Sequence, residues 1–244
     1  MVKVENISKF FGKVHAVKGV SFEVSDGEIV GLIGENGAGK STLLRILSGA
    51  LCPSDGTVHV DGFDLLTQRQ DVRKNIGILF GNEVGLYERL TARENLEYFA
   101  LLSGMNKRNV QKRISVLAEC FEFKKFQNKM AHTLSKGMRQ KVAIARCIVH
   151  DPKIMLFDEP DAGLDFGASK IFFEFLELCK EQKKSVIFSS HSMENVKMYT
   201  DKIVVMRAGN VVKVLNSAEY RESHSNREFN QFLFQLICEE TVSA

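Results

Sequence analysis

The sequence lacks any apolar run that approaches the roughly 18–20 residues needed to cross a bilayer. It also lacks a recognisable secretion signal, because residues 1–6 have the pattern of a strand and not of a signal peptide. No linker, low-complexity tract or internal repeat divides the 244 residues. We therefore expect any link to a membrane to come through a partner.

Regularly spaced cysteines are lacking as well. The five cysteines are odd in number, scattered and without C-x-x-C spacing, which argues against a disulfide framework or a common metal motif. We interpret them as small core hydrophobes in a reducing compartment, most simply the cytoplasm. They are Cys52, Cys120, Cys147, Cys179 and Cys238.

Charge is nearly balanced overall, at +3, but residues 106–150 hold eleven Lys or Arg and two Glu. Such a segment could face nucleic acid, anionic lipid headgroups or the phosphates of a bound nucleotide. It could equally be the solvated face of a helix. Charge alone therefore leaves the alternatives open.

One segment has a specific pattern, G-x-x-x-x-G-K-[ST]. It follows the apolar residues Ile29–Ile33, which predict a buried strand, and precedes apolar residues at helical spacing. This strand–loop–helix context predicts a phosphate-binding loop, whose backbone N–H groups and helix N-terminus surround an anion. Lys40 would reach the β- and γ-phosphates and Ser41 would hold Mg²⁺; the alternative is a simple glycine-rich turn. The segment is Gly34, Glu35, Asn36, Gly37, Ala38, Gly39, Lys40, Ser41 and Thr42.

The remaining pattern predicts an α/β fold. Hairpins are expected in the first sixty residues, and later strands alternate with helices, which implies parallel crossovers. Between about residues 87 and 150 three apolar stripes at helical spacing predict a helical subdomain inserted into the α/β core. The predicted strands are residues 2–7, 20–24, 29–33, 57–60, 76–80, 154–157, 186–189, 203–206 and 211–215.

A second buried strand, residues 154–157, ends in Asp158 and Glu159. Such a strand brings its last residues to the carboxyl edge of a parallel sheet, where the phosphate loop opens. We expect Asp158 to bind Mg²⁺ and Glu159 to orient and deprotonate an attacking water. Taken alone, the pair could be a helix cap, but a Walker B role is favoured downstream of a phosphate loop.

A second anion site is predicted at the start of another helix. In residues 134–140 Ser135 is a good N-cap and Gly137 clears the first turn, so that backbone donors are exposed. A plainly capped helix is the alternative. Two phosphate sites far apart in one chain suggest that two chains share each nucleotide.

Together these motifs resemble the ATP-binding subunits of ABC transporters. The P-loop, a signature similar to Leu-Ser-Gly-Gly-Gln, Walker B, a D-loop (residues 162–165) and a switch histidine occur in the family's order across residues 2–215. The resemblance implies a P-loop NTPase core with a mixed or parallel sheet, an N-terminal antiparallel β subdomain and an inserted helical subdomain. Residues 1–216 would form one ATP-binding domain, and residues 217–244 a partly helical C-terminal tail.

The resemblance also implies roles for single residues. Phe11 would stack on adenine, Ser135 and Gly137 would contact the γ-phosphate held by the opposite subunit, Asp165 would couple the two sites and His191 would sense the γ-phosphate. Alternatives stay open: Phe11 could lie in the core while Phe10 stacks, Asp165 could cap the following helix, and His191 could be structural.

Two departures from the family pattern concern coupling. Gly81 stands where the family's Q-loop glutamine would fall, so that Asn82, Glu83 or water would have to substitute for it. The signature carries Lys136 and Met138 in place of Gly and Gln. Residues 85–96 and 137–146 further resemble the ATPase subunit of bacterial sodium-extruding exporters.

The resemblance thus implies an ATPase with ATP and Mg²⁺, in which Lys40, Glu159 and His191 are catalytic. Two copies would close head to tail on ATP and act on integral membrane permease subunits at the cytoplasmic face of the membrane. Nucleic acid is not an expected partner. Two other functions remain: an ABC-type ATPase acting on nucleic acid or ribosomes, and a nucleotide-binding regulatory module with weak or no hydrolysis.

Overall fold

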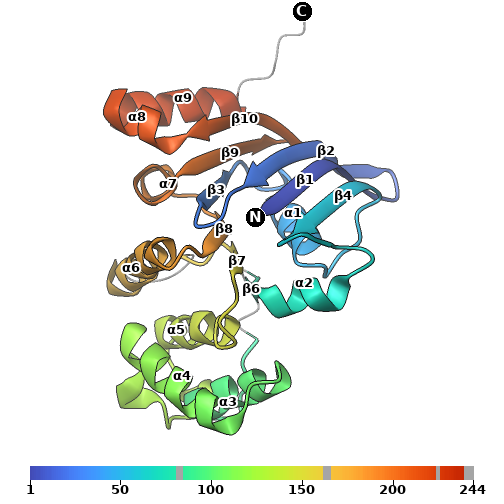
Figure 1. Cartoon of the computed structure of the whole chain (residues 1–244). Helices are drawn as coiled ribbons and strands as arrows, with labels where there is room; N and C mark the ends of the chain where they lie inside the picture. Colours follow the sequence, from blue (N-terminus) through green and yellow to red (C-terminus); the bar gives the residue numbers. More distant parts are fainter. Residues whose placement is uncertain (81–84, 162–165, 224–225, 239–244) are drawn as a thin grey trace, which may run out of the picture.

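The computed structural model describes residues 1–80, 85–161, 166–223 and 226–238, which form two sheets flanked by helices (Figure 1). The strands are β1 (Val2–Phe11), β2 (Val14–Val24), β3 (Ile29–Ile33), β4 (Asp55–Val60), β5 (Phe63–Asp64), β6 (Ile76–Leu79), β7 (Ile154–Asp158), β8 (Ser185–Ser189), β9 (Lys202–Arg207) and β10 (Asn210–Asn216). The helices are α1 (Lys40–Leu47), α2 (Arg69–Asn75), α3 (Ala92–Leu102), α4 (Lys107–Cys120), α5 (Lys136–Cys147), α6 (Phe166–Glu181), α7 (Met193–Tyr199), α8 (Ser217–Ser223) and α9 (Asn226–Cys238), with two 3₁₀ turns, η1 (Lys124–Phe126) and η2 (Ala131–Thr133).

The larger sheet has six strands in the order β10-β9-β3-β8-β7-β6. Strand β3 pairs in parallel with β8 and β9, and β7 pairs in parallel with β6 and β8, whereas β10 is antiparallel to β9. This confirms the predicted α/β fold with a mixed sheet. Because β3, β7 and β8 are parallel, the segments that follow them leave the sheet at the same edge.

The smaller sheet is antiparallel, in the order β2-β1-β4-β5, and is built from the predicted N-terminal hairpins. Helix α1 packs between the two sheets in a single apolar cluster. Its residues Leu43, Leu44, Ile46 and Leu47 are at most 1% exposed, because a helix covered by sheets on both sides needs apolar residues around most of its circumference. This packing fixes the direction of the loop that leads into α1.

Helices α3, α4 and α5 form the helical part of the chain (Figure 1). Side-chain N-caps begin them: Thr91 in a capping box for α3, Asn106 for α4 and Ser135 for α5. One apolar cluster runs from β3, β7 and β8 through α5 and α6 to α3 and α4. The helical part therefore shares its core with one face of the six-stranded sheet.

Among the described residues, the elements β5, α2 and α7 and the two 3₁₀ turns were not predicted from the sequence. Helix α2 has only Val72 buried, so it gives no apolar stripe. The first hairpin is also longer than expected, because β1 continues past Ile7 to Phe11 through register shifts in its pairing with β2. The aromatic residues at the end of β1 consequently lie on a strand and not in a loop.

The interpretation of the cysteines is only partly correct. Cys147 and Cys179 are buried and Cys120 is half-buried, but Cys52 is exposed, so it is not a core residue. Burial raises the pKa of Cys179 to about 12, and a thiol of that kind is unreactive at neutral pH. Within the described ranges, no helix combines the length and apolar character needed to cross a bilayer.

Candidate functional site

The glycine-rich segment forms a tight loop between β3 and α1. All five residues of β3 are buried, so the loop begins at a fixed point of the sheet. A Cβ at Gly34 would lie 2.2 Å from the Met206 carbonyl oxygen, and one at Gly39 would lie 2.6 Å from that of Ala16. Only glycine fits these two positions, and α1 then begins at Lys40 with its N-terminus toward the loop.

Lys40 is held inside this loop. Its side chain is buried, and Nζ donates to the carbonyl oxygens of Gly34 (2.6 Å) and Glu35 (3.0 Å). Burial lowers the pKa of Lys40, an effect that the negative charges of Glu159 and Asp158 oppose. A polyanion placed in the loop would add the negative charge that favours the ammonium form.

Asp158 and Glu159 leave the edge of the sheet beside this loop. Asp158 ends the fully buried strand β7 and pairs in register with Ser189 of β8. The Ser189 hydroxyl donates to Asp158 Oδ1 (2.7 Å) and accepts from the backbone N–H of Glu159 (2.9 Å). Glu159 has a φ of +49°, so the chain turns sharply there and directs its carboxylate away from the strand. The role of Ser189 was not predicted, since it depends on the pairing of two strands.

His191 lies against Glu159. The distance from His191 Nε2 to Glu159 Oε1 is 2.9 Å, and the two residues follow the neighbouring strands β7 and β8. The contact fixes the orientation of the carboxylate. Glu159 is partly exposed, so one of its oxygens can reach a water molecule or a bound group in the adjoining pocket.

These elements enclose a pocket of about 280 Å³. It unites most of the predicted phosphate-binding residues with Glu159, and it adds Ala16 of β2, which sequence reasoning missed. Gly34 and Asp158, which were also predicted, do not line it. The lining residues are Ala16, Glu35, Asn36, Gly37, Ala38, Gly39, Lys40, Ser41, Thr42 and Glu159.

The donor set fits a magnesium triphosphate. Backbone N–H groups at the start of a helix and a buried ammonium group suit phosphate oxygens. The Ser41 hydroxyl and the Asp158 carboxylate are oxygen ligands of the kind that Mg²⁺ prefers, with phosphate and water completing its shell. These are the residues that could hold the ion.

Phe11 lies at the end of β1, outside the pocket lining. Its ring and that of Phe10 are each 49% exposed, so the alternative that places Phe11 in the core is wrong. Phe10 stacks on His15, with ring centroids 3.9 Å apart. Phe11 has Lys9 Nζ 5.3 Å from its ring centroid. Of the two rings, Phe11 is the one not stacked on another aromatic ring among the described contacts.

The predicted second anion site begins α5. The Ser135 hydroxyl accepts from the backbone N–H of Met138 (3.3 Å), as an N-cap should. Ser135 and Lys136 are exposed, and Gly137 is half-buried. Neither Ser135 nor Gly137 lines the pocket at the phosphate loop. Within one chain, the two predicted anion sites therefore stay apart.

Gln140 connects α5 to the end of β7. It is buried, and its Nε2 donates to the Pro160 carbonyl oxygen (3.0 Å). A movement of α5 would therefore act on the backbone of Pro160, the residue that follows Glu159. No pattern in the sequence predicted this contact. Two other predicted positions, Gly81 and Asp165, fall outside the described residues.

Comparison with known proteins identifies the family of the chain. Residues 17–162 match the family described as "ABC transporter". The chain is 45% identical over 225 residues to the ABC transporter ATP-binding protein NatA of Bacillus subtilis, covering 92% of each sequence. Its fold is similar to a solved ATP-binding subunit of an ABC transporter, with a TM-score of 0.86, 27% identity and coverage of 96% of this chain and 99% of that one. It is also similar to a dimeric ATP-binding cassette in a post-hydrolysis state bound to ADP and Pi, with a TM-score of 0.81, 29% identity and coverage of 89% and 99%.

Proposed function

The chain belongs to the ABC transporter family of ATP-binding subunits, and from that premise we propose that it hydrolyses ATP to drive an exporter through separate membrane subunits. One observation carries the proposal. Lys40 and Glu159 line a single pocket, and His191 contacts the Glu159 carboxylate, although the three residues come from distant parts of the sequence. A pocket used only for binding would not need an oriented carboxylate at its edge.

The phosphate loop and Lys40 bind and position the triphosphate. Lys40 would exchange its contacts with the Gly34 and Glu35 carbonyls for the β- and γ-phosphates, where charge builds up during in-line attack. Ser41 and Asp158 would hold Mg²⁺, which when bound offsets the negative charge of the phosphates. We assign residues 34–42 and Asp158 to these roles.

Glu159 is the proposed general base. Its carboxylate would accept a proton from the attacking water, a role that needs a carboxylate within hydrogen-bond reach of that water. His191 orients this carboxylate through the 2.9 Å contact and would contact the γ-phosphate. The hydrogen bonds of Ser189 hold the turn between Asp158 and Glu159, so that the metal ligand and the base keep a fixed separation.

A second copy would complete each site. Ser135 and Gly137 lie away from their own chain's pocket, and a partner turned head to tail could place them over it. The relative solved as a dimer with ADP and Pi supports the pairing of two chains. In it Phe11 would stack on adenine and Asp165 would link the two sites. We assign residues 1–216 to one ATP-binding domain, with its helical subdomain at about 87–150, and residues 217–244 to a C-terminal tail.

Mixing two inactive variants tests the shared site. Neither Lys40→Ala nor Ser135→Arg should hydrolyse ATP alone. In a mixed head-to-tail dimer one site contains both changes and the other contains neither. Co-expressed chains should therefore recover roughly a quarter of the normal rate, because half of random dimers pair the two chains and each such dimer has one intact site of two. The measurement is phosphate release by the mixture.

The opposite model, in which sites are not shared between chains, predicts a different result. If each chain completed its own site, the mixture would remain as inactive as its components. Purification through a different tag on each chain isolates the mixed dimer and doubles the expected recovery to roughly half. A mixture of two differently tagged Lys40→Ala chains is the control, and it should show no recovery.

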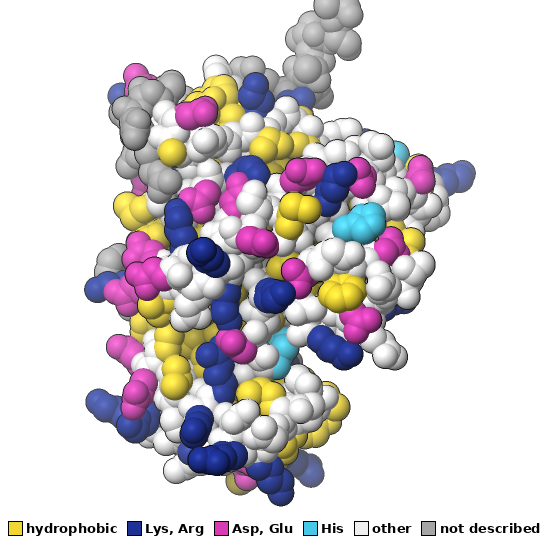
Figure 2. Space-filling model, viewed as in Figure 1, with side chains coloured by type: hydrophobic (Ala, Val, Ile, Leu, Met, Phe, Trp, Pro, Cys, Tyr) yellow, Lys and Arg dark blue, Asp and Glu magenta, His cyan; other side chains and the backbone are white. Residues whose placement is uncertain are grey.

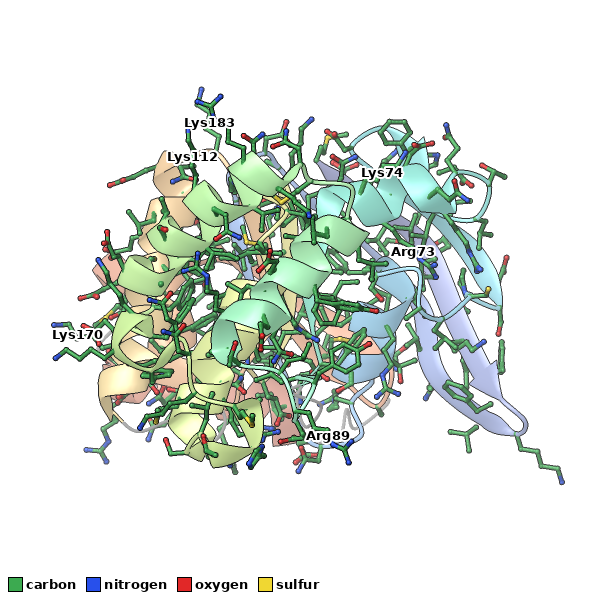
Figure 3. All side chains as sticks on the ribbon, turned by 90° about the horizontal axis from the view of Figure 1, so that it is seen from below. Arg73, Lys74, Arg89, Lys112, Lys170 and Lys183 are labelled. Carbon is green, nitrogen blue, oxygen red and sulfur yellow. The ribbon has the colours of Figure 1, made fainter. Side chains whose placement is uncertain are left out.

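The membrane subunit is proposed to dock beside residues 85–90. Asn95 is buried, and its side chain hydrogen-bonds the backbone of Tyr87, Leu90 and Thr91, which fixes this segment on α3. Residues Tyr87, Glu88, Arg89, Leu90 and Tyr98 line a hollow of about 340 Å³, and Arg89 extends from it (Figure 3).

The docking surface also has exposed apolar side chains. Tyr98 and Leu102 are 44% and 70% exposed, and their i, i+4 spacing places them on one face of α3. Contiguous exposed apolar side chains with a polar rim are typical of protein interfaces. Arg139 pairs with Glu88 through both guanidinium nitrogens, so the surface is joined to α5 and through it to Gln140.

Leu102→Glu should separate docking from catalysis. A carboxylate in an apolar interface would weaken association with the proposed membrane subunit, by about tenfold or more. The ATPase rate of the isolated subunit should not change, because α3 is remote from the phosphate loop. Co-purification and the stimulation of hydrolysis by the membrane subunit are the measurements. Val214→Glu on β10, at a site 42% exposed, is the matched control and should retain docking.

Na⁺ is the cargo that we propose, on the resemblance of residues 85–96 and 137–146 to sodium-extruding exporters. The nucleic-acid alternative is weakened by the ion pairs that four basic side chains of residues 106–150 make with acidic ones. Acidic side chains also appear among the basic ones on the face shown in Figure 2. Arg113, Lys124, Arg139 and Lys141 pair with Asp151, Glu119, Glu88 and Glu122. The regulatory alternative is weakened by the assembled Glu159–His191 pair.

A further inference from the structure

A large groove lies between the start of α7 and the C-terminal helix α9. Its volume is about 1150 Å³, several times the 280 Å³ of the nucleotide pocket. One wall is formed by residues 191–194 and the other by one face of α9, residues 227–235. Apart from His191, no residue that lines this groove has a role in the proposed reaction.

Helix α9 is fixed by its opposite face. Phe229, Leu233 and Ile237 repeat every four residues and are at most 6% exposed. Lys197 of α7 lies over the Phe229 ring, 5.1 Å from its centroid. With these contacts made, the ring of Phe234, which lines the groove, is left 61% exposed. A rigid helix that presents an exposed aromatic ring is typical of an interface.

The groove adjoins the nucleotide site through one side-chain contact. His191 lines the groove, its Nε2 contacts Glu159, and Glu159 lines the nucleotide pocket. A second chain that covers this pocket would therefore lie beside His191, at the edge of the groove. A stable interface needs roughly 800 Å² from each partner, far more than the mouth of the nucleotide pocket provides.

The membrane subunit is a poor candidate to fill the groove. Helices α8 and α9 lie at one end of the molecule, whereas α3 and α4 lie at the opposite end (Figure 1). The proposed membrane-docking surface is on α3. The groove thus adjoins the nucleotide site and is distant from the membrane-docking surface.

We infer that the groove between α7 and α9 receives a second copy of this chain when two chains close on ATP, with Phe234 as a central contact. The inference rests on the proposed function and extends it, because it assigns the C-terminal tail to the nucleotide-dependent interface. Contacts in the groove would also involve residues 191–194, which include the His191 imidazole that orients Glu159.

Phe234→Glu tests the inference in a Glu159→Gln background, which should form a stable dimer with ATP and Mg²⁺. The added change should weaken this dimer about tenfold or more, as the loss of a central aromatic contact does. Dimerisation is measured by sedimentation with ATP and Mg²⁺ present. Val116→Glu on α4, at a site 58% exposed, is the matched control and should leave the dimer unchanged.

Each outcome has a distinct meaning. If Glu159→Gln alone fails to dimerise with ATP, the proposed function fails. If it dimerises and Phe234→Glu dimerises equally well, the inference about the groove is wrong. Binding of a fluorescent ATP analogue by the Phe234→Glu chain, together with its melting temperature, checks that the chain is folded.

A photo-crosslinking amino acid at position 234 gives a second measurement that does not depend on the stability of a charged variant. ATP-dependent crosslinks to another copy of the chain would support the inference. Crosslinks to residues 239–244 of the same chain, or crosslinks that form only with the membrane subunit, would overturn it. Mass spectrometry of the crosslinked peptides distinguishes the three.

Discussion

Replacing Glu159 with glutamine should lower the rate of ATP hydrolysis by about two to four orders of magnitude, as the loss of a general base does. ATP binding should persist, because the loop, Lys40 and Ser41 remain. The amide is nearly the same size as the carboxylate and can still contact His191, so the pocket keeps its shape. ATP should then accumulate in a closed dimer. Phosphate release and sedimentation with ATP measure the two effects.

A surface carboxylate provides the control. Glu174 on α6 is 59% exposed and pairs with Lys170, so Glu174→Gln removes one charge without reaching the site. Its rate should stay near that of the unmodified chain. Turnover by Glu159→Gln within a few-fold of normal would remove Glu159 from the role of base, and the Glu159–His191 contact would then be only structural.

Lys40→Ala should weaken ATP binding by about 100-fold or more, since each hydrogen bond to a charged group contributes about 1.5–3 kcal/mol. The nucleotide-free protein should lose little stability, because the change removes a buried charge together with its two bonds to carbonyl oxygens. The stabilisation that ATP and Mg²⁺ give to the folded protein should disappear. Thermal melting with and without nucleotide measures both quantities.

Lys40→Arg should not restore binding. The pocket places a compact ammonium between the Gly34 and Glu35 carbonyls, and a planar guanidinium does not fit the same position. Lys170→Ala removes a side chain that is 66% exposed and is the control for a general loss of positive charge. Strong ATP-dependent stabilisation of Lys40→Ala would contradict the assignment.

The nucleotide site could be predicted because its parts are local. Gly34, Gly39 and Lys40 act through the backbone of one short loop, and the strand and the helix on either side are apolar runs of distinct period. Asp158 and Glu159 were likewise identified by the buried strand before them. The unpredicted α2 contrasts with these, since Val72 alone is buried there and no apolar stripe marks the helix.

Other parts of the site depend on the pairing of distant segments. Ser189 meets Asp158 because β7 and β8 are neighbours in the sheet, and Gln140 meets Pro160 because α5 packs on the same core. Phe11 and Phe10 are adjacent in sequence with nearly identical chemistry. Only the hairpin shows that both are exposed and that His15 stacks on Phe10.

The sequence by itself determined the phosphate loop, the acidic strand end, the capped helix of the signature and the α/β class, because each depends on residue types at short spacing. Tertiary structure alone decided that Glu159 and His191 touch, that Ser135 lies away from its own chain's pocket and that α9 leaves Phe234 exposed beside His191. These features depend on which strands pair and which helix faces are covered. Such choices are made by burial of the whole apolar core, and no short segment encodes them.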